Sequence, residues 1–388
     1  MDMHTASRTH GYTESVIRRM TRIANAHGAI NLSQGFPNFA APDTLKIGAA
    51  RAIYDDINQY AITWGAKRYR DALAEKYREW YGLDVNPETE LTVTCGATEG
   101  VVCALLAIVD PGDEVIVLEP FYENYGPDTI LCAATPVFVP LADDFSIDLE
   151  RLREAFSADT RAIVVNTPNN PTGRVFSRAE MEGIAALCRE FDAYAVTDEV
   201  YEHIVYDGVE HLPMATLPGM RDRTITVSGA SKTFAVTGWR IGTILAHREV
   251  TDAIRKVHDF LTVGAAAPLQ EGVAAGLEML PDSYYRELGA LYQAKRDLFH
   301  PVLLEAGFRC VKPSGAYYIL ADFSGLSDRP DDEFSEWLTR EIGVAPVPGS
   351  SFFRDPADGR HLVRFAFCKT EALLEDAAER LLRIRARV

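Results

Sequence analysis

Two hydrophobic patterns alternate along the first two thirds of the chain. Short runs rich in β-branched residues are followed by longer segments with helical periodicity, which is typical of a parallel sheet joined by crossover helices. The pattern predicts seven strands, at residues 91–95, 114–119, 136–140, 162–166, 194–197, 224–228 and 241–246. Helices predicted between them include residues 98–109, 149–155 and 178–191.

The pattern changes after Pro281. It predicts a long helix at residues 283–307 and further strands and helices at residues 308–311, 316–321, 332–342, 361–367 and 370–387. We therefore predict an α/β fold whose large domain, residues 45–285, holds a mostly parallel seven-stranded sheet flanked by helices. Residues 286–388 would form a smaller α+β domain. Residues 1–44 would form an N-terminal arm and part of that small domain.

Composition narrows the class of protein. A chain of 388 residues with 47% hydrophobic residues can bury one large core and a smaller second one. The formal charge of −17 comes without a basic stripe, which argues against nucleic-acid binding. No apolar stretch reaches membrane-spanning length, and the first residues lack the apolar core of a signal peptide. The six cysteines show no CxxC and no ligand spacing with histidine, so we expect reduced thiols, a cytoplasmic protein and no metal.

The candidate chemistry begins with Lys232. This lysine stands between small residues, and Arg240 follows eight positions later. The pattern suits a site where an amine reaches a carbonyl group and an arginine holds an anion. A solvated lysine beside a turn is the alternative for this residue taken alone.

A second group of candidates follows two other predicted strands. Asp198 ends a hydrophobic strand, where a carboxylate is costly unless it meets a positive partner such as a protonated ring nitrogen. Tyr201 can donate a hydrogen bond to a phenolate oxygen, and Asn170, between Pro168 and Pro171, can offer its amide to the same oxygen. Taken singly, Asp198 could be a helix cap and Asn170 a turn former.

A third candidate is an anion site. Gly96, Ala97 and Thr98 follow a predicted strand and open a predicted helix, so free N–H groups and the helix dipole favour a phosphate there. Gly96 allows close approach of the backbone, and the hydroxyl of Thr98 adds a donor. An ordinary capped turn remains the alternative for this segment alone.

One cofactor satisfies all of these groups. Pyridoxal 5′-phosphate carries an aldehyde, a pyridine nitrogen, a phenolic oxygen and a phosphate, and a lysine Schiff base with an aspartate partner is typical of its enzymes. We expect Lys232 to form the Schiff base, Asp198 to contact the pyridinium, and Asn170 and Tyr201 to contact the ring oxygen. Arg240 and Ser231 would join residues 96–98 around the phosphate.

The sequence closely resembles the fold type I, class I/II aminotransferases that depend on pyridoxal phosphate. It is most similar to the branch of the kynurenine, glutamine/phenylpyruvate and methionine aminotransferases. The resemblance extends from about Tyr12 to Leu382. The segments that carry it are residues 31–37, 58–60, 95–98, 119–122, 166–173, 198–201, 231–242 and 363–365.

The resemblance implies further roles. Arg364 would bind the substrate α-carboxylate through a bidentate pair, and Gly35 would leave room beside that carboxylate. Tyr122 would stack on the pyridine ring. Tyr60 would reach the cofactor phosphate of a neighbouring subunit, which implies a homodimer with shared active sites.

One position departs from the resemblance. Three residues before the lysine, kynurenine-type members usually carry serine, and this chain has Gly229. Ser231 or Ser228 could compensate, and Ser231 is the better candidate. The Walker lysine of a nucleotide hydrolase is excluded, because that motif requires glycine directly before the lysine, where Ser231 stands.

The sequence thus predicts a ping-pong aminotransferase that moves the α-amino group of an L-amino acid to a 2-oxo acid. Lys232, with a pKa lowered by its cationic and desolvated site, would act as general base. Aromatic residues near the site favour aromatic, methionine-like or glutamine-like donors. A β- or γ-eliminating lyase or a cyclase that uses the same cofactor remains the alternative, since Lys232, Asp198 and Arg364 do not separate these reactions.

Overall fold

The computed structural model describes Ala6 and residues 15–387. The other residues before Ser15, including Tyr12 at the start of the resemblance, lie outside the described residues, so the predictions for them are not examined by the structure. The chain folds around a seven-stranded sheet in the order β2-β8-β7-β6-β5-β3-β4. Its strands are β2 Leu91–Thr94, β3 Glu114–Glu119, β4 Thr135–Pro140, β5 Thr160–Asn166, β6 Tyr194–Asp198, β7 Thr224–Gly229 and β8 Gly242–Leu245.

The sheet is parallel except at one strand. β8 runs antiparallel to both β2 and β7, and the pairings among β3, β4, β5, β6 and β7 are parallel. The central strands are buried on both faces, which explains their nearly continuous hydrophobic sequences. The predicted fold class is confirmed.

Two layers of helices cover the sheet. Because side chains alternate along a strand, Val115 and Val117 of β3 pack into one core with α4 and α9, while Ile116 and Leu118 pack into another with α6 and α7. A third core joins the β2 and β8 end of the sheet to α3 and α10. The helices are α2 Asp43–Tyr54, α3 Lys67–Tyr81, α4 Ala97–Ile108, α5 Tyr125–Leu131, α6 Leu149–Ala155, α7 Arg178–Glu190, α9 Arg248–Leu261 and α10 Ala267–Met279.

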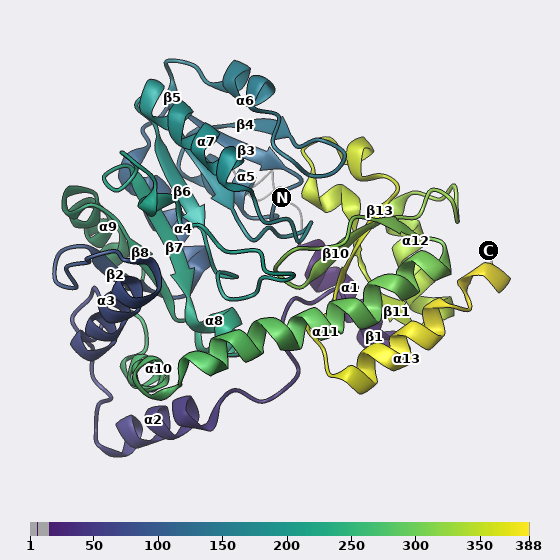
Figure 1. Cartoon of the computed structure of the whole chain (residues 1–388), viewed down its shortest axis with the longest axis horizontal. Helices are drawn as coiled ribbons and strands as arrows, with labels where there is room; N and C mark the ends of the chain where they lie inside the picture. The colour runs from purple at the N-terminus through teal and green to yellow at the C-terminus, as the bar shows by residue number, and fades with distance from the viewer. Residues whose placement is uncertain (1–5, 7–14, 388) are drawn as a thin grey trace, which may run out of the picture.

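A second, smaller sheet lies beside the first (Figure 1). It is antiparallel, in the order β12-β13-β10-β9, and its strands are β9 Arg309–Cys310, β10 Tyr318–Asp322, β12 Val347–Pro348 and β13 Leu362–Ala366. The long helix α11 Asp282–Ala306 runs from the side of α10 to this sheet (Figure 1). The remaining elements here are α1 Val16–His27, α12 Asp331–Trp337, the π-helix Leu338–Ile342 and α13 Glu371–Leu381.

Residues near the N-terminus join this smaller part. The short strand β1 Ile30–Asn31 pairs in parallel with β11 Val344–Ala345. The pairing agrees with the expectation that the N-terminal segment contributes to the second unit, and the boundaries at residues 45 and 285 stay a prediction. No helix among the described residues is both long and apolar enough to cross a membrane.

Candidate active site

A cavity of about 210 Å³ lies where the carboxyl ends of the parallel strands meet the smaller sheet. Ligands of α/β proteins commonly bind at this edge of a sheet. Eleven of the residues predicted from the sequence line it: Gly35, Ala97, Thr98, Tyr122, Asn170, Asp198, Tyr201, Ser231, Lys232, Arg240 and Arg364. Gly96 and Tyr60 are not among the lining residues.

Lys232 lies on the short helix α8 Ala230–Thr233, directly after β7. Its Nζ donates a hydrogen bond to the carbonyl oxygen of Gly35 at 3.1 Å. Burial lowers the pKa of Lys232 to about 8, with Arg240 and Arg364 adding to the effect and Asp198 opposing it. The neutral, nucleophilic amine is therefore accessible near neutral pH.

Asp198 ends β6 and is buried. Its carboxylate accepts a hydrogen bond from the hydroxyl of Tyr125 at 2.7 Å and a longer one, of 3.4 Å, from the N–H of Val200. Burial raises the pKa of Asp198 above its ordinary value, and the Tyr125 hydrogen bond offsets only part of this effect. A cationic ligand atom beside Asp198 would stabilise the ionised form, so this position fits a protonated ring nitrogen.

The N-terminus of α4 and Arg240 form a cationic corner of the cavity. Gly96 has φ +86°, and a Cβ at this position would lie 2.3 Å from Nη2 of Arg240, so only glycine lets the guanidinium approach the turn. Arg240 donates to the carbonyl oxygen of Thr237 at 3.1 Å. It forms no ion pair with a carboxylate of the described residues. The open N–H groups of the first helical turn and this guanidinium fit a phosphate.

Arg364 is the second arginine of the cavity and is only 1% exposed. It donates to Oδ1 of Asn170 at 2.8 Å and to the carbonyl oxygen of Ser33 at 2.7 Å. Its guanidinium carbon lies 4.4 Å from the ring centroid of Tyr318. Nε has no hydrogen-bond partner among the described residues. A buried guanidinium that forms no ion pair with a carboxylate of the described residues fits an anionic ligand group.

Tyr318 connects several predicted residues. Its hydroxyl lies 3.0 Å from that of Tyr201. A Cβ at Gly35 would come within 1.9 Å of the same hydroxyl. The sequence argument for Gly35 expected a side chain to obstruct a substrate carboxylate, and the structure adds that Tyr318 itself leaves no room for one.

The structure also accounts for Gly229. A Cβ there would lie 2.7 Å from the carbonyl oxygen of Ile241, so the backbone of this chain excludes a serine at that position. Ser228 donates its hydroxyl to Glu202, away from the cavity. Ser231 lines the cavity, which leaves it as the candidate to compensate.

Sequence reasoning missed several residues of this site. Tyr125 supports Asp198, Tyr318 contacts Arg364, and Asn166 donates its amide to the carbonyl oxygen of Asp198 at 2.9 Å. Asn166 and Tyr125 stand close to recognised motifs, yet nothing in their spacing distinguished them from core or turn residues. Tyr318 lies in a predicted strand, where an aromatic residue is ordinary.

Comparisons with known proteins agree on one family. Residues 27–381 match the model of aminotransferase class I and II. The chain is 39% identical to the probable N-succinyldiaminopimelate aminotransferase of Mycobacterium tuberculosis, over 97% of this chain and 98% of that protein. It is 36% identical to the methionine aminotransferase of Escherichia coli, over 95% of each chain. It is also 35% identical to human kynurenine–oxoglutarate transaminase 1, over 93% of each.

Solved structures give the same result. The N-succinyldiaminopimelate aminotransferase from Mycobacterium tuberculosis superposes with a TM-score of 0.95 at 39% identity, covering 98% of this chain and all of the other. An aspartate aminotransferase from Thermus thermophilus superposes with a TM-score of 0.91 at 34% identity, covering 99% and 100%. The chain therefore belongs to the class I and II aminotransferases, enzymes that use pyridoxal 5′-phosphate to transfer an amino group between an amino acid and a 2-oxo acid.

Proposed function

We propose that this enzyme transfers the α-amino group of an L-amino acid whose side chain is uncharged. We also propose that the cavity at the strand ends is its active site. The observation that carries the proposal is the set of charges in that cavity. Lys232, Arg240 and Arg364 line it together with the buried carboxylate of Asp198. Among the described residues none of these four groups forms an ion pair, and each matches one part of cofactor or substrate.

The cofactor would be held by the residues that line the cationic corner and the end of β6. Backbone N–H groups of Ala97 and Thr98 with Ser231 and Arg240 would bind the phosphate, and Gly96, whose own N–H is donated to the Thr94 carbonyl oxygen at 2.8 Å, would let the turn approach it. Asp198 would bind the ring nitrogen, Asn170 and Tyr201 the ring oxygen, and Tyr122 the face of the ring. Lys232 would hold the cofactor covalently through Nζ. When bound, pyridoxal phosphate supplies the electron sink for the reaction.

Lys232 would also move the proton. Its lowered pKa of about 8 makes an appreciable fraction of the free amine neutral near neutral pH. Nζ can then accept the proton from the substrate α-carbon as general base. It can donate this proton to a second carbon of the reacting system as general acid. The Gly35 carbonyl oxygen, 3.1 Å from Nζ, would hold the side chain in place.

Arg364 would position the amino acid. Its orphaned Nε and its buried guanidinium plane suit the α-carboxylate, and Asn170 and Tyr318 hold the plane in place. Gly35 would leave space at the same point. A site built this way selects α-amino acids over simple amines.

The donor class follows from the charges that remain. Among the described residues that line the cavity, Lys232, Arg240 and Arg364 are the cationic ones, and each already has a role. No further cation among the described residues lines the cavity to meet a side-chain carboxylate, so aromatic, methionine-like and glutamine-like donors are favoured over aspartate. The names of the kynurenine and methionine transaminase relatives agree with this class.

Two further properties belong to the proposal. Tyr60 is 84% exposed and lies outside the cavity of its own chain, which supports a homodimer in which it reaches the phosphate of the neighbouring site. The six cysteines are all free, which supports a reducing, cytoplasmic location.

The test is a half-reaction screen. Purified holoenzyme is mixed with kynurenine, phenylalanine, methionine, glutamine, aspartate and N-succinyldiaminopimelate, and loss of the long-wavelength absorbance of the bound cofactor is followed. We expect the uncharged donors to react fastest, with 2-oxo acid formed in step with a second amino acid. Release of ammonia would instead indicate elimination.

The Lys232→Ala variant tests the assignment of the lysine. It should lose turnover by at least three orders of magnitude, because both the covalent anchor and the proton carrier are removed. Borohydride treatment of the parent should label Lys232 in a peptide map. Full turnover by the variant, or label elsewhere, would refute the assignment.

A further inference from the structure

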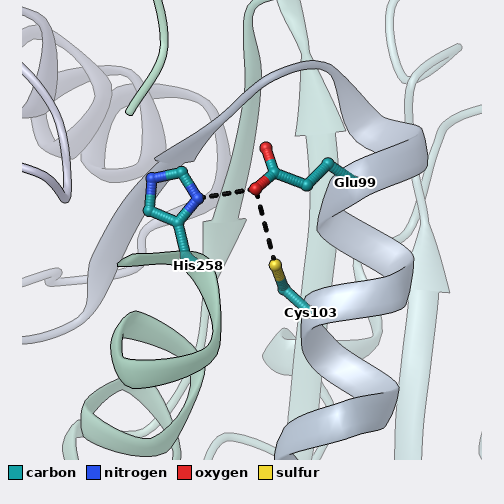
Figure 2. A group of neighbouring side chains, drawn as sticks. All are labelled: Glu99, Cys103 and His258. Atoms are coloured by element: carbon teal, nitrogen blue, oxygen red, sulfur yellow. Dashed lines mark hydrogen bonds and ion pairs between the residues drawn. The ribbon is translucent and has the colours of Figure 1, made fainter. Parts of the chain in front are cut away.

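A carboxylate stands directly behind the proposed phosphate site. Glu99 follows Thr98 in the first turn of α4, the turn whose N–H groups would hold the phosphate. An additional negative charge at this point would repel a phosphate. The contacts of Glu99 explain how the site tolerates it (Figure 2).

Glu99 is held by donors from several segments. Its Oε2 accepts from the backbone N–H of Cys95, in the turn before α4. Its Oε1 accepts from Nδ1 of His258 at 2.8 Å and from the hydroxyl of Thr262 at 2.7 Å. The thiol of Cys103, one turn along α4, lies 3.7 Å from Oε1. The carboxylate therefore ties α4 to α9 and to the residues just after it.

The partners of His258 determine its protonation. Its ring is fully buried, with Nδ1 facing the carboxylate of Glu99 and Nε2 lying 2.9 Å from the carbonyl oxygen of Thr63. A carboxylate and a backbone carbonyl are both acceptors. With Glu99 ionised, both ring nitrogens donate and the ring is an imidazolium.

The charges around this pair agree with that geometry. Burial alone would lower the pKa of His258, but the contacts with Glu99, Thr63 and Asp259 outweigh it and raise that pKa above its ordinary value. Burial likewise opposes ionisation of Glu99, but hydrogen bonds from His258, Thr262 and Cys95 hold its pKa below the ordinary value. The two groups thus form an ion pair with no net charge.

We propose that His258 is a positioning residue for the cofactor phosphate: as an imidazolium it cancels the charge of Glu99 behind the phosphate turn and anchors the Thr63 carbonyl. Thr63 lies three residues after Tyr60, and the carbonyl of the next residue, Trp64, accepts from Val93 in β2 at 3.1 Å. His258 thereby fixes the base of the segment whose Tyr60 would enter the neighbouring site. This inference rests on the proposed phosphate site, and its link to Tyr60 rests on the proposed homodimer.

A metal ion is the competing explanation for the same three side chains. Ligand atoms of Glu99, Cys103 and His258 lie within 4.8 Å of one another. A tetrahedral zinc ion would hold its nitrogen and oxygen ligands about 3.3 Å apart, whereas Nδ1 and Oε1 are 2.8 Å apart and directly hydrogen-bonded (Figure 2). The spacing favours the ion pair over a metal site.

The protonation state can be measured without reference to activity. Holoenzyme labelled with ¹⁵N-histidine is examined by NMR at pH 8, with His258 assigned by its loss in His258→Gln. We expect both nitrogens of His258 to carry protons, before and after addition of EDTA or zinc. A neutral ring, or a zinc-dependent change of its Nδ1 signal, overturns the proposal.

The role toward the phosphate is measured as release of pyridoxal phosphate from the holoenzyme into a trapping protein. His258→Gln leaves Glu99 charged and should release the cofactor at least tenfold faster than the parent. The double variant Glu99→Gln/His258→Gln restores a neutral pair and should recover most of that loss. His211→Gln, which removes the buried contact of His211 with Glu199 outside the cavity lining, is the matched control and should release at the parent rate.

The outcomes separate the alternatives. Release from the double variant as fast as from His258→Gln, or parent-like release from His258→Gln, overturns the electrostatic role. If the parent retains no pyridoxal phosphate at Lys232, the proposed function fails, while the NMR result on His258 still stands by itself. The NMR arm measures the parent protein, and the double variant, which also lacks His258, serves to assign the signal if His258→Gln alone does not fold.

Discussion

At the scale of single residues, the informative feature of this protein is buried charge without an internal partner. Arg364 and Asp198 are both buried: Arg364 donates to the neutral side chain of Asn170, Asp198 accepts from the neutral hydroxyl of Tyr125, and these bonds satisfy each charge only in part. An unpaired buried charge costs several kcal/mol. Both of these buried charges line one cavity, where charged groups of a bound ligand would offset that cost.

The guanidinium geometry of Arg364 gives a first prediction. Arg364→Lys keeps the positive charge but loses the planar pair of donors and the stacking on Tyr318. We expect KM for the amino acid to rise about 10- to 100-fold, since a charge-assisted hydrogen bond is worth about 1.5–3 kcal/mol. Steady-state kinetics check this. An unchanged KM would place the α-carboxylate elsewhere.

Sequence alone identified the charged residues of the site but not their neutral supports. Lys232 stood out because it stands among small residues, and Asp198 because a carboxylate at the end of an apolar strand needs a positive partner, whereas the role of Arg364 came from the family resemblance. Tyr125 and Tyr318 did not, because an aromatic residue in a core or strand needs none. Their roles depend on where a hydroxyl group lies after distant segments have packed together.

At the scale of elements, the proposed phosphate-binding turn depends on the close approach of two strands and a helix. β8 begins at Gly242 beside the turn that opens α4, and a Cβ at Gly242 would lie 2.3 Å from the backbone carbon of Gly96 and 2.6 Å from the nitrogen of Ala97. Both neighbours are backbone atoms, so no side chain can move to make room. Gly242 is thus required by packing.

Gly242→Ala supplies the second prediction. The added methyl group should displace the start of β8 from the turn at residues 96–97, because overpacking costs about 1–3 kcal/mol. We expect a lower Tm of the apoenzyme and faster release of pyridoxal phosphate, measured by calorimetry and by a trapping assay. Gly238→Ala is the matched control: nothing lies within 4 Å of its Cβ, and both quantities should stay at parent values.

At the scale of the whole molecule, a polar network ties α3 to the strands behind the active site. Glu202 accepts from Lys76, Tyr81 and Ser228. Burial alone would raise its pKa, but the contacts with Lys76 and Tyr81 hold that pKa well below the ordinary value. His203 lies beside this network between the rings of Trp80 and Tyr285. Burial, with Lys76 adding, lowers the pKa of His203 to about 3.

His203 therefore gives the stability of the protein a defined pH dependence. Between about pH 6.5 and pH 3 the unfolded chain binds a proton at His203 and the folded chain does not, so stability falls as pH falls through this window. At pH 5 the loss from this group is about 2 kcal/mol. Urea unfolding at pH 7.5 and 5.0 should show that His203→Phe, which keeps a ring between Trp80 and Tyr285, loses about 2 kcal/mol less than the parent. Equal losses would mean that His203 is protonated in the folded protein.

The proposed dimer predicts complementation between inactive chains. If Tyr60 acts in the neighbouring site, a heterodimer of Lys232→Ala and Tyr60→Ala chains contains one site with both native residues. Unfolding and refolding the two variants together should restore about a quarter of parent activity, since half of the random dimers are mixed and each has one native site.

The control uses a residue of the same chain's cavity. Lys232→Ala mixed with Arg364→Ala produces no native site, because each site draws both residues from one chain, and no activity should return. Restoration in this control, or its absence in the Tyr60 mixture, would contradict the shared site.

Local sequence patterns were sufficient to predict the alternation of strands and helices and the seven strands of the large sheet. They also singled out charged residues that stand among apolar or small residues as candidates for the site. Periodicity and turn composition act over a few residues, so they can be read without knowing which segments meet. The order of the strands, the antiparallel direction of β8 and the pairing of β1 with β11 depend on contacts between distant residues. So do the exclusion of a side chain at Gly35 by Tyr318 and the ion pair of Glu99 with His258. Only packing of the complete chain brings those atoms within reach of one another.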